Sequence, residues 1–209
     1  MKIKTVTLLV GIFLFLACST DDDSSAAQVT SVIYNETIIN TTFFQEGSSA
    51  PTVNWNGNQG SFSLAGTIQG VSINTTTGVL SWSKLLAPKT HVVQVIATNS
   101  EGQTTITITL KNPLQGVFTK INNPTESIEI EFNTDNTMVM RTIDTSITGT
   151  TDARSGTYTI NDNTILVDFM DNSGFSLIGP LTQSTSVATY SIDLIYSGTV
   201  AASFEVTMN

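Results

Sequence analysis

The sequence predicts an all-β fold of two domains, and three observations lead to this prediction. Apolar and polar residues alternate over many short runs, which is the period-two pattern of half-buried strands. No long stretch repeats apolar residues at the helical spacings i, i+3, i+4 and i+7. The 209 residues fit one or two domains of about 100–200 residues each. With 40% hydrophobic and only 12% charged residues, the chain is too apolar to be disordered.

Residues 1–17 have the pattern of a secretory signal peptide. Two lysines precede an apolar run from Val6 to Ala17, which is shorter than the about 20 residues that span a bilayer. The segment Leu14-Phe15-Leu16-Ala17-Cys18 resembles the lipobox of bacterial lipoproteins, with Phe15 where the family usually has Leu. This resemblance implies that Cys18 carries acyl chains such as palmitate and becomes the mature N-terminus. The alternative is an ordinary signal peptide followed by an incidental Cys.

Residues 18–28 are expected to be a tether between the lipid anchor and the folded part. The stretch from Ser19 to Ser25 contains three Asp and no apolar residue, so it has nothing to bury in a core. It resembles the acidic export signal of surface lipoproteins in Bacteroidota. This resemblance implies a lipid-anchored protein exposed on the bacterial outer membrane. A plain solvated spacer is the alternative.

Residues 29–112 are predicted to form the first domain. A dense apolar run from Val92 to Ala97 ends at the turn sequence Asn99–Gly102. Thr104 to Leu110 then alternates, with isoleucines and Leu on one face and threonines on the other. Asn112-Pro113 ends this strand, because Pro has no N–H for the ladder, and we place the domain boundary there.

The first domain also carries a recognisable order of motifs. Gly70–Trp82 contains two short strands around a turn at Gly78, and Val92–Gly102 follows with the pattern V-x-A-T-N-x-x-G. This order resembles the Ig-like or cadherin-like repeats of bacterial surface proteins. It implies a β-sandwich with Trp82 in its core and a spacer or binding role. No calcium is expected, because a site needs about six oxygen ligands and the acidic residues here are far apart in sequence: Glu36, Glu46 and Glu101.

Residues 114–209 are predicted to form the second domain. Ile128, Ile130 and Phe132 alternate with Glu129 and Glu131, which separates a core face from a water face. Turns rich in Asp, Asn and Gly divide the rest of the segment into short strands. About eight strands result, so we expect an eight-stranded antiparallel barrel or a two-sheet sandwich.

The opening of this domain resembles the small lipocalin-like domains of Bacteroidota lipoproteins. The resemblance rests on Gly116-Val117-Phe118, where lipocalins usually have Trp, and on Gly156-Thr157-Tyr158-Thr159-Ile160. It implies a barrel that could enclose one small apolar ligand. A fully packed interior is the alternative, because the inward residues are large: Phe132, Phe169, Tyr190 and Phe204.

Composition excludes several classes of function. Seventeen acidic against eight basic residues give a formal charge of -9, so the chain lacks the basic surface that nucleic acid requires. One Cys and one His exclude a disulfide framework and a Cys/His zinc site. The sequence therefore predicts no nucleic-acid partner, no metal and no cofactor.

The sequence also predicts that the protein is not an enzyme. It has no G-x-S-x-G elbow, no G-x-G-x-x-G and no P-loop. His91, the only base for a Ser nucleophile, is expected to be an ordinary strand-edge residue. Asp168, Asp171, Glu129, Glu131 and Asp135 are candidates for a glycosidase pair only because they are acidic. Asp135, Asp162 and Asp171 lie beside Asn in turn positions, and Glu129 and Glu131 lie on the water face.

A surface binding or structural role remains. Trp55 lies in an Asn- and Gly-rich stretch, and an exposed aromatic among amides suits stacking on a sugar ring. Glycan binding or support of polysaccharide capture is therefore the leading hypothesis, with Trp55 as the expected contact. Alternatively, Trp55 fills one end of the sandwich. Two other functions stay open: an adhesin or assembly subunit that contacts a surface protein, and a carrier of a small apolar ligand in the second domain.

Lipidation is the first testable prediction. Metabolic labelling with an alkyne palmitate should label the wild-type protein and leave the Cys18→Ser variant unlabelled, because no other Cys is present. The level of unprocessed precursor, read on an immunoblot, controls for expression. A Cys18→Ser variant that labels as strongly as the wild type contradicts the site.

Overall fold

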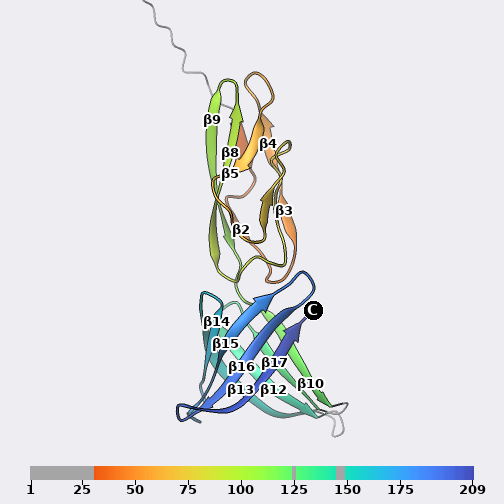
Figure 1. The fold of residues 1–209 in the computed structure, drawn as a ribbon, viewed down its shortest axis with the longest axis vertical. Helices are drawn as coiled ribbons and strands as arrows, with labels where there is room; N and C mark the ends of the chain where they lie inside the picture. Colours follow the sequence, from red (N-terminus) through yellow and green to blue (C-terminus); the bar gives the residue numbers. More distant parts are fainter. Residues whose placement is uncertain (1–30, 124–125, 145–148) are drawn as a thin grey trace, which may run out of the picture.

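The computed structural model describes residues 31–123, 126–144 and 149–209, and all regular structure in these ranges is strand. The strands form two bodies stacked end to end along the long axis of the molecule (Figure 1). The predicted all-β class is confirmed, and the second body is the barrel of the two forms expected. Cys18 and the predicted signal and tether lie outside the described residues. Within the described ranges, no helix is long and apolar enough to cross a membrane.

The first body is a β-sandwich of short strands around one long hairpin. The four-stranded sheet has the order β2-β9-β8-β5, the three-stranded sheet β3-β7-β6, and β1 pairs with β4. Strand β2 runs parallel to β9, and the other pairs are antiparallel. The strands are β1 (Ser31–Tyr34), β2 (Ile38–Asn40), β3 (Gly47–Ser49), β4 (Pro51–Asn54), β5 (Ser61–Leu64), β6 (Val71–Ile73), β7 (Leu80–Trp82), β8 (Thr90–Asn99) and β9 (Gly102–Lys111).

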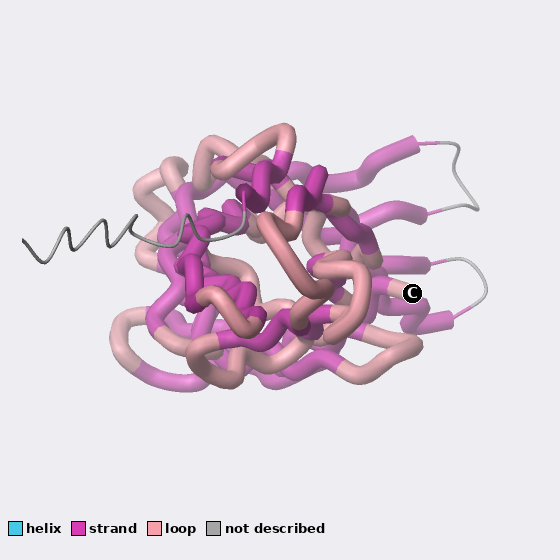
Figure 2. The backbone as a smooth tube through the Cα atoms, turned by 90° about the horizontal axis from the view of Figure 1, so that it is seen from above, coloured by secondary structure: helices cyan, strands magenta, loops and turns pink. Residues whose placement is uncertain are grey.

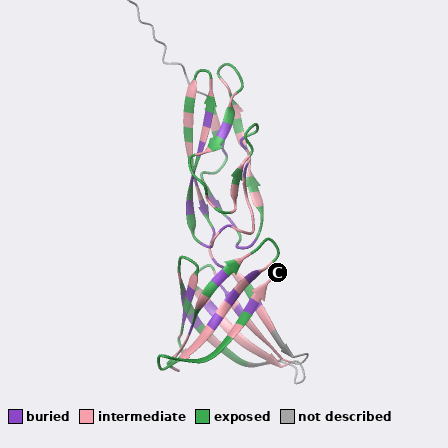
Figure 3. Ribbon diagram, viewed as in Figure 1, coloured by how far each residue is buried: buried purple, intermediate pink, exposed green. Residues whose placement is uncertain are grey.

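The alternation in the sequence places the sandwich core as predicted. Buried and exposed positions alternate along the strands of the sandwich (Figure 3). Ile108 and Leu110 of β9 are fully buried, whereas Thr105 and Thr107 are exposed. Trp82 packs against the same core cluster. The β1–β4 pair is linked to the β6–β7 turn, where the hydroxyl of Tyr34 donates to the carbonyl of Gly78 at 2.5 Å. Gly78 has a φ of 72°, a conformation that Gly adopts without steric cost.

The second body is a closed barrel in which each strand pairs with the next and β17 pairs back to β10. Its strands are β10 (Gly116–Asn123), β11 (Glu126–Phe132), β12 (Thr137–Asp144), β13 (Gly149–Asn161), β14 (Thr164–Phe169), β15 (Phe175–Gln183), β16 (Ala188–Tyr196) and β17 (Thr199–Met208). Asn136, Asp162 and Asn172 occupy positive φ in the hairpin turns, as the Asp/Asn turn signals predicted. Seen from above, the barrel strands spread wider than the sandwich (Figure 2).

Aromatic side chains fill the barrel where it adjoins the sandwich. Phe132 meets Phe118, Tyr158 and Tyr190 edge-on, at centroid distances of 5.7, 5.0 and 6.0 Å. All four are at most 4% exposed. Edge-to-face pairs at such distances add to the stability gained by burial. This part of the barrel interior therefore has the packed core that was the alternative to a ligand cavity.

The junction between the bodies is also packed. Phe43, in the loop between β2 and β3, belongs to the barrel core cluster and stacks on Phe118 at 6.3 Å. Gln183 at the end of β15 donates from its amide to the carbonyl of Lys84 at 2.7 Å and lies 3.2 Å from that of Leu86. The predicted boundary at Asn112-Pro113 falls in the short connection between β9 and β10. The sandwich and the barrel thus share buried apolar surface and hydrogen bonds.

Phe43→Ala tests this coupling. Truncating a buried Phe costs about 3–5 kcal/mol, so the free energy of unfolding of residues 26–209 should fall by about that amount. Urea titration monitored by circular dichroism measures it. Val92→Ala, at a side chain that is 61% exposed, is the control and should stay within about 0.5 kcal/mol of the wild type. A loss below about 1 kcal/mol for Phe43→Ala is inconsistent with a packed junction.

Candidate functional site

Trp55, the residue predicted to contact glycan, is half-buried at the end of the sandwich away from the barrel. Its ring centroid lies 5.3 Å from that of Phe62, and a Cβ at Gly60 would lie 2.7 Å from the indole. The loop that follows Trp55 is held to the β8–β9 turn by a hydrogen bond from the side-chain amide of Asn99 to the backbone carbonyl of Asn58. The indole is therefore packed against the sandwich, as expected if Trp55 fills one end of it. The role of Trp55 in glycan binding stays a prediction.

The carboxylates considered as catalytic candidates have local partners. Asp135 accepts hydrogen bonds from Thr137, and Asp171 accepts one from the backbone N–H of Ser173. These bonds hold the pKa of both carboxyls below the usual range. Glu131 pairs with Arg141 at 2.8 Å. Within the described residues, no group of three or more His, Cys, Asp and Glu side chains comes together.

His91 is buried rather than at a strand edge. It is the second residue of β8 and 7% exposed, and its Nε2 lies 2.9 Å from the carbonyl oxygen of Ala87. A carbonyl oxygen can only accept a hydrogen bond, so Nε2 is the donor in this contact. The side chain therefore closes the loop before β8, a structural role that the sequence pattern did not show.

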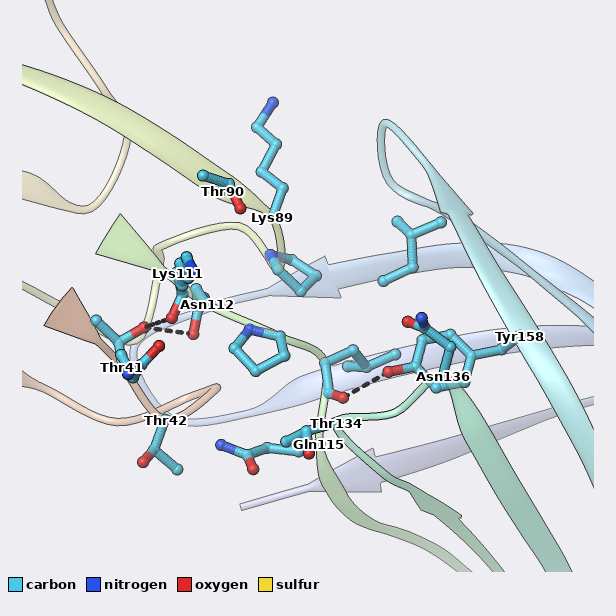
Figure 4. Close-up of a pocket in the computed structure, with 15 residues that line it drawn as sticks. Thr41, Thr42, Lys89, Thr90, Lys111, Asn112, Gln115, Thr134, Asn136 and Tyr158 are labelled. Atoms are coloured by element: carbon cyan, nitrogen blue, oxygen red, sulfur yellow. Dashed lines mark hydrogen bonds between the residues drawn. The ribbon is translucent and has the colours of Figure 1, made fainter. Parts of the chain in front are cut away.

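A groove of about 720 Å³ opens between the sandwich and the barrel (Figure 4). This volume lies within the range of about 300–1,000 Å³ that is typical of ligand pockets, which often form at domain interfaces. Figure 4 shows Thr41, Lys111 and Asn112 on one side and Asn136 with Tyr158 on the other. The lining residues are Asn40, Thr41, Thr42, Pro88, Lys89, Thr90, Lys111, Asn112, Pro113, Leu114, Gln115, Thr134, Asn136, Tyr158 and Ile160.

The sandwich wall of the groove is one row of side chains across three strands. Asn40 of β2 pairs in register with Lys111 of β9, and Lys111 pairs with Thr90 of β8. All three residues are exposed. Because neighbouring strands lie about 4.8 Å apart, the amide, the ammonium and the hydroxyl start from adjacent backbone positions. The row offers hydrogen-bond donors of three kinds along one edge.

The floor of the groove is fixed by Asn112, which is 2% exposed. Its amide nitrogen donates to the carbonyls of Leu86 and Ala87 at 2.8 and 3.1 Å. Its amide oxygen accepts from the hydroxyl of Thr41 at 2.9 Å. Both ends of this amide are therefore used, as buried polar groups require. The floor is rigid before any ligand arrives.

The barrel wall is held by Tyr158. Its hydroxyl oxygen lies 2.7 Å from the carbonyl of Leu114 and 2.9 Å from that of Asn133, so it joins the interdomain connection to the β11–β12 turn. Burial, followed by the charge of Asp135, raises the pKa of Tyr158 to about 12. The N–H of Tyr158 donates to the carbonyl of Asn136 at 2.9 Å, which fixes that turn at the rim.

Sequence reasoning did not identify this groove. Its residues come from five separated stretches of the chain. Two of these carry sequence patterns noted above, the break at Asn112-Pro113 and the motif Gly156–Ile160, but neither was predicted as part of a site. Hydroxyls and amides dominate the lining, and no carboxylate of the described residues belongs to it. Such a surface can hydrogen-bond a polar ligand but holds neither a nucleophile–base pair nor a set of metal ligands.

Tyr158→Phe tests the barrel wall. Between pH 10 and 12 the unfolded state loses the tyrosine proton while the folded state retains it, so stability falls with rising pH. Below pH 10 this contribution is fully present. Tyr158→Phe should lower stability by about 1–2 kcal/mol at pH 7 and reduce the alkaline slope by about 1.4 kcal/mol per pH unit. Urea titrations at several pH values measure both. An unchanged slope contradicts the raised pKa.

No protein-family model matches this chain, and no curated protein matches it significantly. The solved structures that resemble it are weak neighbours of the cadherin and Ig type. Human protocadherin-24 EC1-2 shares 9% identity over 85% of this chain and 95% of that chain, with a TM-score of 0.37. The titin domains z1z2 in complex with telethonin share 12% over 86% and 94%, with a TM-score of 0.35. Drosophila OTK extracellular domains 3–5 share 14% over 85% and 60%, with a TM-score of 0.32.

Proposed function

We propose that this protein is a non-catalytic, lipid-anchored surface protein that binds glycan in the groove between its two domains. The observation that carries the proposal is the groove itself, with a polar lining on fixed walls. Sugar rings present many hydroxyls, and the amides and hydroxyls of Asn40, Thr90 and Gln115 can pair with them. Pro113, which is half-buried, adds apolar surface for the C–H face of a ring.

The hydrogen-bonded walls of the groove support ligand binding there. Asn112 and Tyr158 already have their hydrogen-bond partners, so the walls need little ordering when a ligand binds. A preformed site loses less conformational entropy than a flexible one, which favours affinity. The groove is therefore a better candidate than Trp55, whose indole is engaged with Phe62.

The direction of the chain fits an anchor at Cys18. Ser31, the first described residue, pairs with Asn54 beside the Trp55 loop, at the end of the sandwich away from the barrel (Figure 1). An anchor before Ser31 would therefore leave the groove and the barrel on the side away from the membrane. A binding site in that position is open to external polymers.

A structural role is the second candidate, and the packed junction favours it. A spacer must hold its domains in line, and Phe43 with Gln183 couples the sandwich to the barrel. Assembly by strand addition has less support in the described part of the chain. The edge strands β2, β3, β5 and β6 have only three or four residues each, which leaves short backbone edges for a partner.

Affinity electrophoresis of residues 26–209 against a panel of plant and microbial polysaccharides tests the proposed function. At least one glycan should retard the wild type. Thr42→Trp, which places an indole in the groove, should abolish the retardation. Thr107→Trp, on the exposed face of β9, is the matched control and should behave as the wild type.

Trp55→Ala separates the two candidate sites. Loss of retardation in Trp55→Ala but not in Thr42→Trp would place the site at the end of the sandwich instead. Absence of retardation by every glycan, with a folded protein, would reject glycan binding and leave the structural role.

A further inference from the structure

The basic residues of this acidic protein are distributed unevenly. Six of its eight Lys and Arg residues lie in the described ranges, because Lys2 and Lys4 fall outside them. Two of the six, Lys89 and Lys111, line the groove, whereas none of the 14 Asp and Glu residues in the described ranges does (17 less Asp21, Asp22 and Asp23). A protein of formal charge -9 thus carries a locally positive groove.

The other basic residues in the described ranges have partners within the protein. Arg141 and Arg154 make the ion pairs. Lys84 and Lys120 lie over the rings of Phe44 and Phe204, with the ammonium nitrogen 4.6 and 5.5 Å from the centroid. No such contact occupies Lys89 or Lys111, both of which are exposed. Their ammonium groups are available to a ligand.

Asp135 is the acidic residue that lies in the sequence between two lining residues, Thr134 and Asn136. Its Oδ1 accepts from the N–H of Thr137 at 3.0 Å and from the hydroxyl of the same residue at 2.6 Å. This carboxylate is therefore engaged with its own turn. It reduces the positive potential of the groove without pairing with either lysine.

Resting on the proposed function, we propose that the groove selects polysaccharides that carry an anionic group, carboxylate or sulfate, on the sugar ring. Lys111 lies between Asn40 and Thr90 in the row across β2, β9 and β8. The ammonium can bind the anionic group while the neighbouring amide and hydroxyl bind the ring hydroxyls. Lys89 follows Pro88 at the rim, where its flexible stem can reach a second charge of the same polymer.

Ionic strength decides whether this local charge prevails over the net negative charge. At about 0.15 M salt the Debye length is about 8 Å, so the distant carboxylates of the protein are screened from a polyanion in the groove. Contacts to Lys111 at hydrogen-bond distance are screened much less. Selection of an acidic polymer is therefore expected at physiological salt.

Isothermal titration calorimetry of residues 26–209 in 0.15 M NaCl tests the inference with matched pairs of polymers. Polygalacturonate is compared with its methyl ester, and dextran sulfate with dextran. At least one anionic polymer should bind ten times more tightly than its neutral counterpart, and which pair responds identifies carboxylate or sulfate. Lys111→Gln should weaken that binding at least tenfold, and Lys89→Gln by a few-fold.

Arg141→Gln is the charge-matched control, because Arg141 pairs with Glu131 on the barrel and does not line the groove. Its affinity should equal that of the wild type. Equal affinity for both members of each pair, or equal loss in Arg141→Gln and Lys111→Gln, would overturn the inference. Neutral glycan binding that Thr42→Trp abolishes would then still uphold the proposed function. Absence of binding to all four polymers would also overturn the inference, whereas the proposed function is rejected only if no glycan of the electrophoresis panel retards the protein.

Discussion

The structure depends on the carbonyl groups of the loop between β7 and β8. Three side chains donate to them. His91, at the start of β8, donates to Ala87. Asn112 donates to Leu86 and Ala87, and Gln183 of the barrel donates to Lys84, both from distant parts of the chain. Unpaired buried carbonyls would be costly, so each donor is needed where it is. The same bonds close the sandwich, fix the groove floor and attach the barrel.

Aromatic packing continues this coupling into the barrel. Phe43 extends from the sandwich onto Phe118, which meets Phe132, which in turn meets Tyr158 and Tyr190. Tyr158 then returns to the connection through its hydrogen bond with Leu114. Buried aromatic contacts and interdomain hydrogen bonds thus form one continuous unit. A groove whose walls belong to such a unit keeps its shape in the absence of a ligand.

The polar character of the groove follows from its position. It lies where the ends of β2, β8 and β9 face the β11–β12 turn, and strand ends and turns carry hydroxyl and amide side chains. Of the described residues that line the groove only Tyr158 is aromatic, and its side chain is buried with its hydroxyl engaged in the barrel wall. Recognition at this site would therefore depend on hydrogen bonds and the charge of Lys111 rather than on stacking.

The sequence by itself determined the strands and turns, because alternation of Ile and Thr in β9 and the Asp/Asn turns of the barrel are local patterns. It also predicted Trp82 in the sandwich core and large aromatics inside the barrel. Closure of the barrel, the burial of His91 and the meeting of Asn40, Lys111 and Asn136 were decided by the tertiary structure. Those features require contacts between residues far apart in the chain, and no local period encodes which distant residues will meet.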